Sequence, residues 1–390
     1  MAQNWTDNEM KANRLVIFIL IGLLAIAGSG CGMVGGFFDS VTNAVGANDT
    51  GTVIASRAQI RSSYAVVAAD LLEVKRGMTM NILEEIEFER VKWYRVRASD
   101  EDQTEGWIEA QNVIIGSLLD KSRKIAEADK GLAPQAEGDL RASTNLRLTP
   151  EQRDDNIILK LEKKGDNDTS FHIMGWKYVP KADTSDVDDS SKNKANRPRT
   201  KNEEVEAAKE ENKPLVMDEK YDVWYKVRLD PSVSPAPAGW IFGRQVELQL
   251  PTDIAIYQKE SNRMVTWQRL DGAETEEKVS KDNVKVAKPG SWVILLRSNV
   301  VKSTDGNEPN FDSILVLGYD KYDQSHYTVC RVENANGDIP LRIEGTGDNK
   351  SFRVNIRNAA GGSEEKQFVL FRDAKGKLKI NTPPDLPCKK

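Results

Sequence analysis

Trp93-Tyr94-Arg95-Val96-Arg97, followed by Gly106-Trp107-Ile108, is the stretch that decides the fold, because this pair of motifs occurs twice. The second copy reads Trp224-Tyr225-Lys226-Val227-Arg228 and Gly239-Trp240-Ile241. Short runs in which apolar and polar residues alternate are typical of β-strands. Because the spacing between the two motifs is nearly the same in both places, the sequence predicts two copies of one small β domain.

Two further landmarks accompany each copy. Gln59-Ile60-Arg61-Ser62 and Arg76-Gly77 precede the first, and Asn145-Leu146-Arg147-Leu148 and Lys164-Gly165 precede the second. In this order, the four landmarks resemble the bacterial Src-homology-3-like (SH3b) family. The resemblance implies a small antiparallel barrel at 53–116 and another at 138–250. It also implies an aromatic groove and attachment to peptidoglycan or to a protein partner.

The candidate groove residues are the aromatic side chains of the repeated motifs. They are Trp93, Tyr94, Trp107, Trp224, Tyr225 and Trp240. Adjacent residues of a strand point to opposite faces, so we expect one member of each Trp-Tyr pair to be buried and the other to face outward. Two interpretations stay open: core packing with an ordinary surface aromatic, or a groove for a peptide or a glycan stem.

Two segments separate or interrupt the copies. Leu118, Leu119, Ser122, Ile125 and Ala126 share one helical face, which predicts a helical linker over 117–137. Lys181 to Lys220 holds 20 charged residues in 40, nine positive and eleven negative, and no aromatic residue. Such a composition buries too little apolar surface to offset its ordering entropy. We expect a flexible insertion between two strands of the second barrel.

From 251 to 390 the chain predicts eight or nine strands with almost no helix. Turn signals such as Asp305-Gly306-Asn307 and Asn336-Gly337-Asp338 separate the runs. This pattern predicts an antiparallel barrel or sandwich, and a mainly β protein overall. Gly290-Ser291-Trp292 and Leu317-Gly318-Tyr319-Asp320 resemble motifs of lipocalin-type barrels, which leaves a ligand-carrying barrel as a further possibility.

The N-terminal region contains a long apolar stretch. Leu15 to Phe38 is 24 residues without a charge, and Lys11 and Arg14 precede it. The small residues Gly28, Ser29 and Gly30 lead into Cys31, an order that resembles the lipobox of bacterial lipoproteins. The resemblance implies a signal peptide at 1–31, a covalent lipid on Cys31, a flexible tether at 32–52 and, since Gly32 follows the cysteine, the outer membrane.

Two other interpretations of this stretch stay open. A signal-anchor helix is one, because 24 residues exceed the roughly 20 that span a bilayer core. Gly28, Gly32 and Gly36 would then form its packing face. A plain cleaved signal is the other. All three keep the basic residues inside and place the C-terminal body on the exported, periplasmic side of the membrane.

The cysteines also point to an oxidising compartment. With Cys31 lipidated, Cys330 and Cys388 remain as a pair among the three cysteines. In an exported protein such a pair predicts a disulfide.

Catalytic, metal and nucleotide sites are not indicated. A net charge of -5 over this length argues against a nucleic-acid partner. His172 and His326 stand in no catalytic or metal-binding spacing. Asp183, Asp186, Asp188 and Asp189 form a solvated charge run in the insertion, and no phosphate-binding loop follows a strand.

The predicted function is therefore non-catalytic. We expect no metal and no cofactor beyond the lipid. The body is predicted to be an envelope module that binds peptidoglycan or cell-wall peptide through its barrels. The alternative is a structural subunit of an envelope assembly that contacts proteins.

Overall fold

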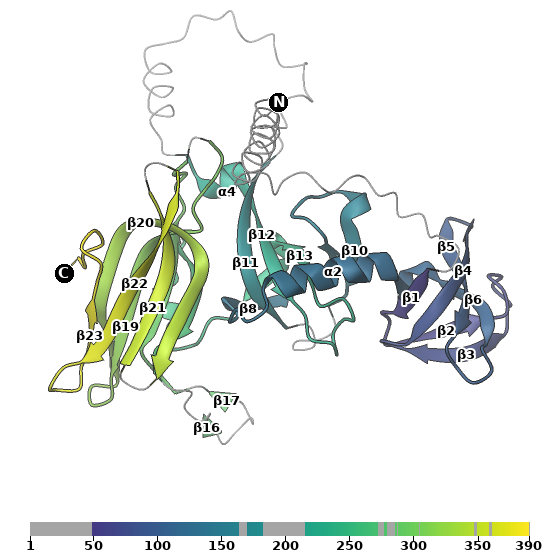
Figure 1. Ribbon diagram of the computed structural model, residues 1–390, viewed down its shortest axis with the longest axis horizontal. Coiled ribbons are helices and arrows are strands. Elements are labelled where there is room, and N and C mark those ends of the chain that lie inside the picture. The colour runs from purple at the N-terminus through teal and green to yellow at the C-terminus, as the bar shows by residue number, and fades with distance from the viewer. Residues whose placement is uncertain are drawn as a thin grey trace, which may run out of the picture. The chain divides into compact units, whose positions relative to one another are not determined.

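The computed structural model describes residues 49–163, 170–181, 215–271, 277–278, 285–286, 288–303, 305–346, 349–358 and 361–389. These residues belong to one compact unit, Val45–Lys390. The protein is mainly β, with three seven-stranded antiparallel sheets and a two-stranded one (Figure 1). The apolar stretch around Cys31 and most of the charged insertion lie outside the described residues. Within those residues, no helix has the length and apolar character that crossing a membrane requires.

The first copy of the repeat forms a sheet with the strand order β3-β2-β6-β5-β4-β1-β7. Its strands are β1 (Thr50–Val53), β2 (Arg57–Arg61), β3 (Asp70–Lys75), β4 (Thr79–Phe88), β5 (Val91–Ala98), β6 (Glu105–Glu109) and β7 (Val113–Ile115). A helix, α2 (Gly116–Ala128), follows β7; it begins one residue before the predicted range 117–137 and ends nine residues before the end of that range. Leu118, Leu119 and Ser122 form its buried face.

The second copy has the corresponding order, β10-β9-β13-β12-β11-β8-β14. Its strands are β8 (Ala136–Leu140), β9 (Thr144–Arg147), β10 (Ile157–Leu161), β11 (Phe171–Pro180), β12 (Tyr221–Arg228), β13 (Ala238–Phe242) and β14 (Val246–Leu248). The agreement extends to irregularities: the ladder skips one residue after Ile82 in β4 and one after Ile173 in β11. The repeated sequence therefore corresponds to a repeated three-dimensional unit.

The insertion begins and ends at neighbouring points of this second unit. Lys181 N–H donates to Lys220 C=O at 2.9 Å, just beyond the paired ends of β11 and β12. A short helix, α4 (Met217–Lys220), leads back into β12. In the first copy the corresponding strands β4 and β5 are joined by the tight turn at Glu89 and Arg90.

The glycine of each Gly-Trp-Ile motif allows β2 and β6, or β9 and β13, to approach closely. A Cβ added to Gly106 would lie 2.5 Å from the backbone oxygen of Arg61. One added to Gly239 would lie 2.7 Å from the Leu146 side chain and 2.9 Å from the Arg147 oxygen. A side chain at either place would push the paired strands apart.

We predict that Gly106→Ala lowers the free energy of unfolding by about 1–3 kcal/mol, the usual cost of an overpacked interior. Urea unfolding followed by circular dichroism measures the change. Gly175→Ala is the control, because the Cβ added there would meet its nearest neighbour, Lys226 Cβ, at 3.5 Å, an ordinary contact. Equal stability of the two variants would contradict the close-approach explanation.

The C-terminal region forms one curved antiparallel sheet, a half-barrel, instead of a closed barrel or two packed sheets (Figure 1). Its order is β15-β18-β19-β20-β21-β22-β23. The strands are β15 (Asn262–Arg269), β18 (Trp292–Ser298), β19 (Phe311–Asp320), β20 (Ser325–Thr346), β21 (Asn349–Arg357), β22 (Ser363–Arg372) and β23 (Leu378–Asn381). β16 (Glu277–Lys278) and β17 (Lys285–Val286) form a separate pair. Four 3₁₀ helices of three residues each complete the described elements: Ala110–Asn112, Asp154–Asn156, Gly243–Gln245 and Ala255–Tyr257.

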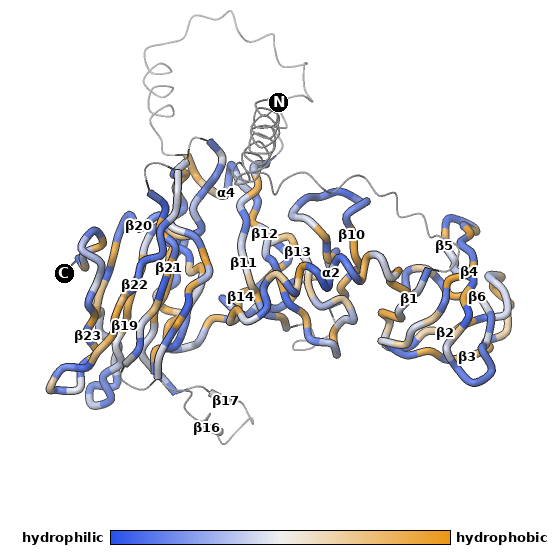
Figure 2. The backbone as a smooth tube through the Cα atoms, viewed as in Figure 1, coloured by the Kyte–Doolittle hydropathy of each residue, from blue (hydrophilic) through white to orange (hydrophobic). Residues whose placement is uncertain are grey.

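Side chains fill the inner face of the half-barrel. Phe352 and Phe368 stack with ring centroids 4.6 Å apart, and both are fully buried with Phe311. Figure 2 shows hydrophobic and hydrophilic residues interspersed along the strands. The packed interior accounts for the stability of an open sheet.

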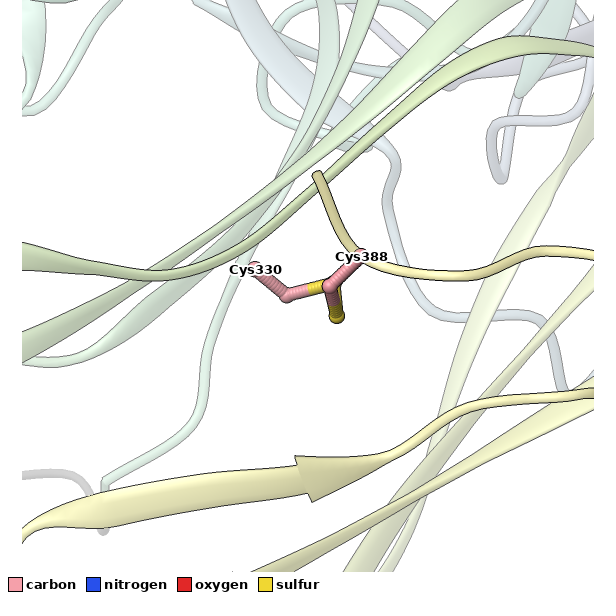
Figure 3. The surroundings of a disulfide bond; sticks show 2 residues. All are labelled: Cys330 and Cys388. Atoms are coloured by element: carbon pink, nitrogen blue, oxygen red, sulfur yellow. A yellow bond between two sulfur atoms is a disulfide. The ribbon is translucent and has the colours of Figure 1, made fainter. Parts of the chain in front are cut away.

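The predicted disulfide between Cys330 and Cys388 is present (Figure 3). It joins β20 to the segment after β23 across 58 residues of sequence, and Cys330 is buried. The prediction from cysteine count and compartment is therefore confirmed for this pair.

We predict that the Cys330→Ala/Cys388→Ala variant lowers the free energy of unfolding of the C-terminal sheet by about 4 kcal/mol, because a loop of this length gains that much entropy in the unfolded chain. Guanidinium unfolding monitored by tryptophan fluorescence measures the loss. An unchanged midpoint would show that the bond adds nothing beyond the sheet's own packing.

Buried polar side chains join the second copy to the flanking elements. Gln135, between α2 and β8, accepts the Leu341 N–H at 2.7 Å and donates to the Leu341 oxygen at 3.2 Å. Its own backbone oxygen accepts the Thr266 hydroxyl of β15. Ser122 of α2 donates to the Ala238 oxygen at 2.6 Å and accepts the Ala238 N–H at 3.1 Å. These bonds fix α2 and the half-barrel to the second copy.

A buried ionic cluster lies where α4 meets the half-barrel. Arg297 bonds to Glu308 at 2.5 Å and to Asp312 at 3.0 Å, and all three side chains are at most 4% exposed. The remaining carboxylate oxygen sites accept backbone N–H groups, those of Lys302 and Ser303 among them. Since each charge is paired and hydrogen-bonded, the cluster is a structural junction.

Candidate binding surface

Four of the six predicted groove residues are buried. Trp93 and Tyr94 are 6% and 7% exposed, and Trp224 and Tyr225 are 2% and 7% exposed. The expectation that one member of each pair faces solvent is wrong, because both faces of the aromatic strand are covered. The four side chains therefore pack mainly in the interior, and of these Tyr225 also borders a pocket of 560 Å³ next to Asp218 and Arg244.

Neighbouring aromatic rings cover the second pair. Trp224 lies directly opposite Phe242, with ring centroids 5.2 Å apart. Tyr225 meets Trp176 edge to face at 4.6 Å. Burial, the largest cause, raises the pKa of Tyr225 above its usual range. In the first copy, burial raises the pKa of Tyr94 to about 12, and the Glu85 carboxylate adds to the effect.

Trp107, the fifth candidate, lies in a partly exposed aromatic group. Tyr64 contacts Trp107 edge to face at 5.2 Å and Phe88 at 5.0 Å, measured between ring centroids. Phe88 pairs directly with Val91 across the β4–β5 turn, and both are exposed. Two residues beyond Tyr64, Val66 and Val67 are almost fully exposed at 84% and 94%. We name Tyr64, Val66, Val67, Phe88, Val91 and Trp107 the first-copy apolar surface.

Arg61 holds the loop that presents this surface. Its Nη2 donates to the Val66 oxygen at 2.9 Å and to the Ala68 oxygen at 3.1 Å. Ser62 and Ala69 close the base of the loop through their backbone and a hydroxyl. Exposed valines on a braced loop keep their apolar side chains in water, an arrangement typical of interaction sites.

Sequence reasoning missed Tyr64, Phe88 and the valines. The signal that marks them is the composition of Ser62–Ala69, which is apolar where a connection between strands is usually polar. The contacts of Tyr64 with Phe88 and Trp107 join the β2–β3 loop to β4 and β6. They form only in the folded sheet, so no local sequence pattern reports them.

Within its described residues, the second copy has no equivalent surface. Arg147, in the place of Arg61, braces its loop in the same way, through Asn156 at 2.9 Å and the Arg153 oxygen. This loop contains no aromatic residue, so Trp240, the sixth candidate, has no partner corresponding to Tyr64. Pro150 and Glu151 instead border a cleft of 490 Å³ shared with the half-barrel.

The two histidines lie in unrelated places. His326 Nε2 lies 2.8 Å from the Gly290 oxygen and 3.5 Å from Asp253, so this nitrogen carries a proton and donates. His172 is half exposed, 4.0 Å from Glu137. In the described parts of the chain, no three side chains of the metal-binding types converge on a point.

Comparisons with known proteins add no family. No family model matches the chain, and no curated protein matches it. Among solved structures, the structure of NlpC1 from Trichomonas vaginalis is similar at 7% sequence identity, covering 92% of this chain and 97% of that chain, with a TM-score of 0.14. A TM-score this low does not indicate a shared fold, so the similarity carries no argument here.

We predict that Tyr94→Phe reduces the loss of stability at alkaline pH. A phenol whose pKa rises from 10.0 to about 12 on folding contributes stability below pH 10, and this is lost as pH rises toward 12. Between pH 9 and pH 11 the wild type should lose about 1.4 kcal/mol more than the variant. Urea unfolding at both pH values measures the difference, and parallel losses would place Tyr94 in contact with solvent.

Proposed function

We propose that this protein is a membrane-anchored, exported component of a bacterial envelope that binds cell-wall peptide or glycan without catalysis. Its two repeated sheets are SH3b-like barrels. Cys31 carries the lipid that anchors it, and the first-copy apolar surface is the binding surface.

The observation that carries the proposal is the aromatic group of the first copy. Tyr64, Phe88 and Trp107 gather on one surface, and exposed valines extend it. An aromatic ring offers an apolar face to a sugar ring or to an extended peptide at a small cost in conformational entropy. The bracing by Arg61 lowers that cost further, because the loop is ordered before the ligand arrives.

The assignment to SH3b-like barrels is supported by the repeated strand order and by the four landmarks of the sequence. Membrane anchorage is supported by the uncharged stretch Leu15 to Phe38, which contains Cys31, and export also agrees with the disulfide.

A second candidate function is a structural subunit of an envelope assembly. It is favoured by the polar and ionic bonds that join the second copy to α2 and to the half-barrel. A single body with one exposed apolar surface also suits attachment to a protein. Binding to the cell wall distinguishes the two candidates.

We predict that the full chain, solubilised in mild detergent, sediments with purified peptidoglycan sacculi in a saturable manner. Tyr64→Ala/Trp107→Ala should weaken this binding about tenfold or more, because aromatic anchors at the centre of an interface contribute more than about 1.4 kcal/mol each. Trp240→Ala is the matched control at the equivalent position of the second copy, and it should bind as the wild type does.

Both variants are first checked for folding by circular dichroism. Sedimentation no greater than that of an unrelated lipoprotein would reject the wall ligand and favour the assembly subunit. Equal losses in the Trp107 and Trp240 variants would place binding outside the first-copy apolar surface.

A further inference from the structure

The second copy shows how this fold binds a helix. The buried face of α2 lies against β13 and β10, and Ser122 exchanges two hydrogen bonds with Ala238 at the start of β13. At the C-terminal end of α2, Asp129 pairs with Lys226 of β12 at 2.8 Å. Arg228 of β12 donates to the Asp129 backbone oxygen, also at 2.8 Å.

The strand pairing identifies the same positions in the first copy. Trp107 pairs with Arg95, as Trp240 pairs with Lys226. Two residues further along β5, Arg97 therefore corresponds to Arg228. Both positions carry a positive charge in both copies.

The apolar part of the helix site also has a counterpart. One residue is left unpaired at the same place in β3 and β10, and this makes Leu71 of the first copy the counterpart of Ile158 in the second. Ile158 is 5% exposed, next to α2, whereas Leu71 is 47% exposed. A Cβ on Gly106 would lie 3.2 Å from Leu71, so this leucine borders the Gly-Trp-Ile strand.

Among the described residues, no helix covers this face of the first copy. Arg95 and Arg97 are 47% and 43% exposed and both pair with Glu105, at 3.3 and 2.6 Å. Glu105 occupies the place of Ala238 and supplies the negative charge that Asp129 supplies in the second copy. Exposed ion pairs contribute about 0–1 kcal/mol each, so an incoming carboxylate exchanges with Glu105 at little cost.

We propose that the face formed by Leu71, Arg95 and Arg97 is a docking site for an amphipathic helix of a partner protein. The helix places apolar residues three or four positions apart on Leu71 and an acidic residue near its C-terminal end on the two arginines. The negative end of the helix dipole then also faces the arginines. Trp107 of the first-copy apolar surface pairs across the strands with Arg95, so the two sites adjoin. The helix contacts Leu71 and the two arginines, and the proposal does not depend on wall binding.

The probe is a peptide with the sequence of residues 116–130, which contains α2 and Asp129. A lactam between Asp120 and Lys124, both on its exposed face, stabilises the short helix. Fluorescence anisotropy measures its binding to the full chain in mild detergent. We expect saturable binding that Arg95→Glu/Arg97→Glu weakens at least tenfold.

A charge exchange tests the predicted contact directly. A peptide carrying Asp129→Lys should bind the wild type at least tenfold more weakly and should recover binding to the Arg95→Glu/Arg97→Glu protein. A structural defect in the variant does not produce such a recovery. Tyr64→Ala should leave peptide binding unchanged, which separates this site from loss of wall binding.

Several outcomes overturn the proposal. One is the absence of saturable binding. Another is an affinity that Arg95→Glu/Arg97→Glu leaves unchanged. Loss on Lys226→Glu alone would mean that the peptide exchanges with α2 on the second copy. Binding seen only after removal of residues 1–44 would assign the face to the chain's own N-terminal segment instead of a partner.

Discussion

The contact between the second copy and the half-barrel depends on the hydrogen bonds that the buried backbone of Leu341 requires. Register is lost between Asp338 and Arg342 of β20, so the backbone of Leu341 has no ladder partner in β21. Buried backbone groups need hydrogen bonds. The side-chain amide of Gln135 bonds to both the N–H and the C=O of Leu341. The backbone of Gln135 bonds to Ile173 of β11 and to Thr266 of β15. Gln135, a single residue of the linker, thus supplies hydrogen bonds to polar groups in two sheets.

The repeat has kept its interior and changed its surroundings. Ile60, Ile82, Val96 and Ile108 are fully buried in the first copy, and Leu146, Ile173, Val227 and Ile241 are fully buried in the same places of the second. The outer faces differ because the second copy supports α2 and the half-barrel, whereas the first copy carries exposed apolar residues and ion pairs. Under the proposed function, this difference assigns support to the second copy and recognition to the first.

The repeat could be predicted from sequence because its motifs lie within single strands. Gly106 and Gly239 mark close approaches that recur with the pattern, and the cysteine pair follows from compartment and number. The half-barrel could not be distinguished from a barrel or a sandwich, since strand patterns do not report whether the outermost strands meet.

The candidate site was only partly predictable. Alternation on a strand correctly separates the faces of Trp93 and Tyr94, but it does not report what covers each face. Trp107 was identified, whereas its contacts with Tyr64 and Phe88 come from a loop and a distant strand. Long-range packing of this kind leaves no local periodicity in the sequence.

The hydrogen bond between Lys181 and Lys220 also bears on which insertions and deletions the chain tolerates. Because both ends of the intervening segment are fixed side by side, its length does not enter the geometry of β11 and β12. Codons can be gained or lost there without altering strand register. The position is accordingly suited to accept a foreign domain, such as a fluorescent reporter, whose own termini lie close together.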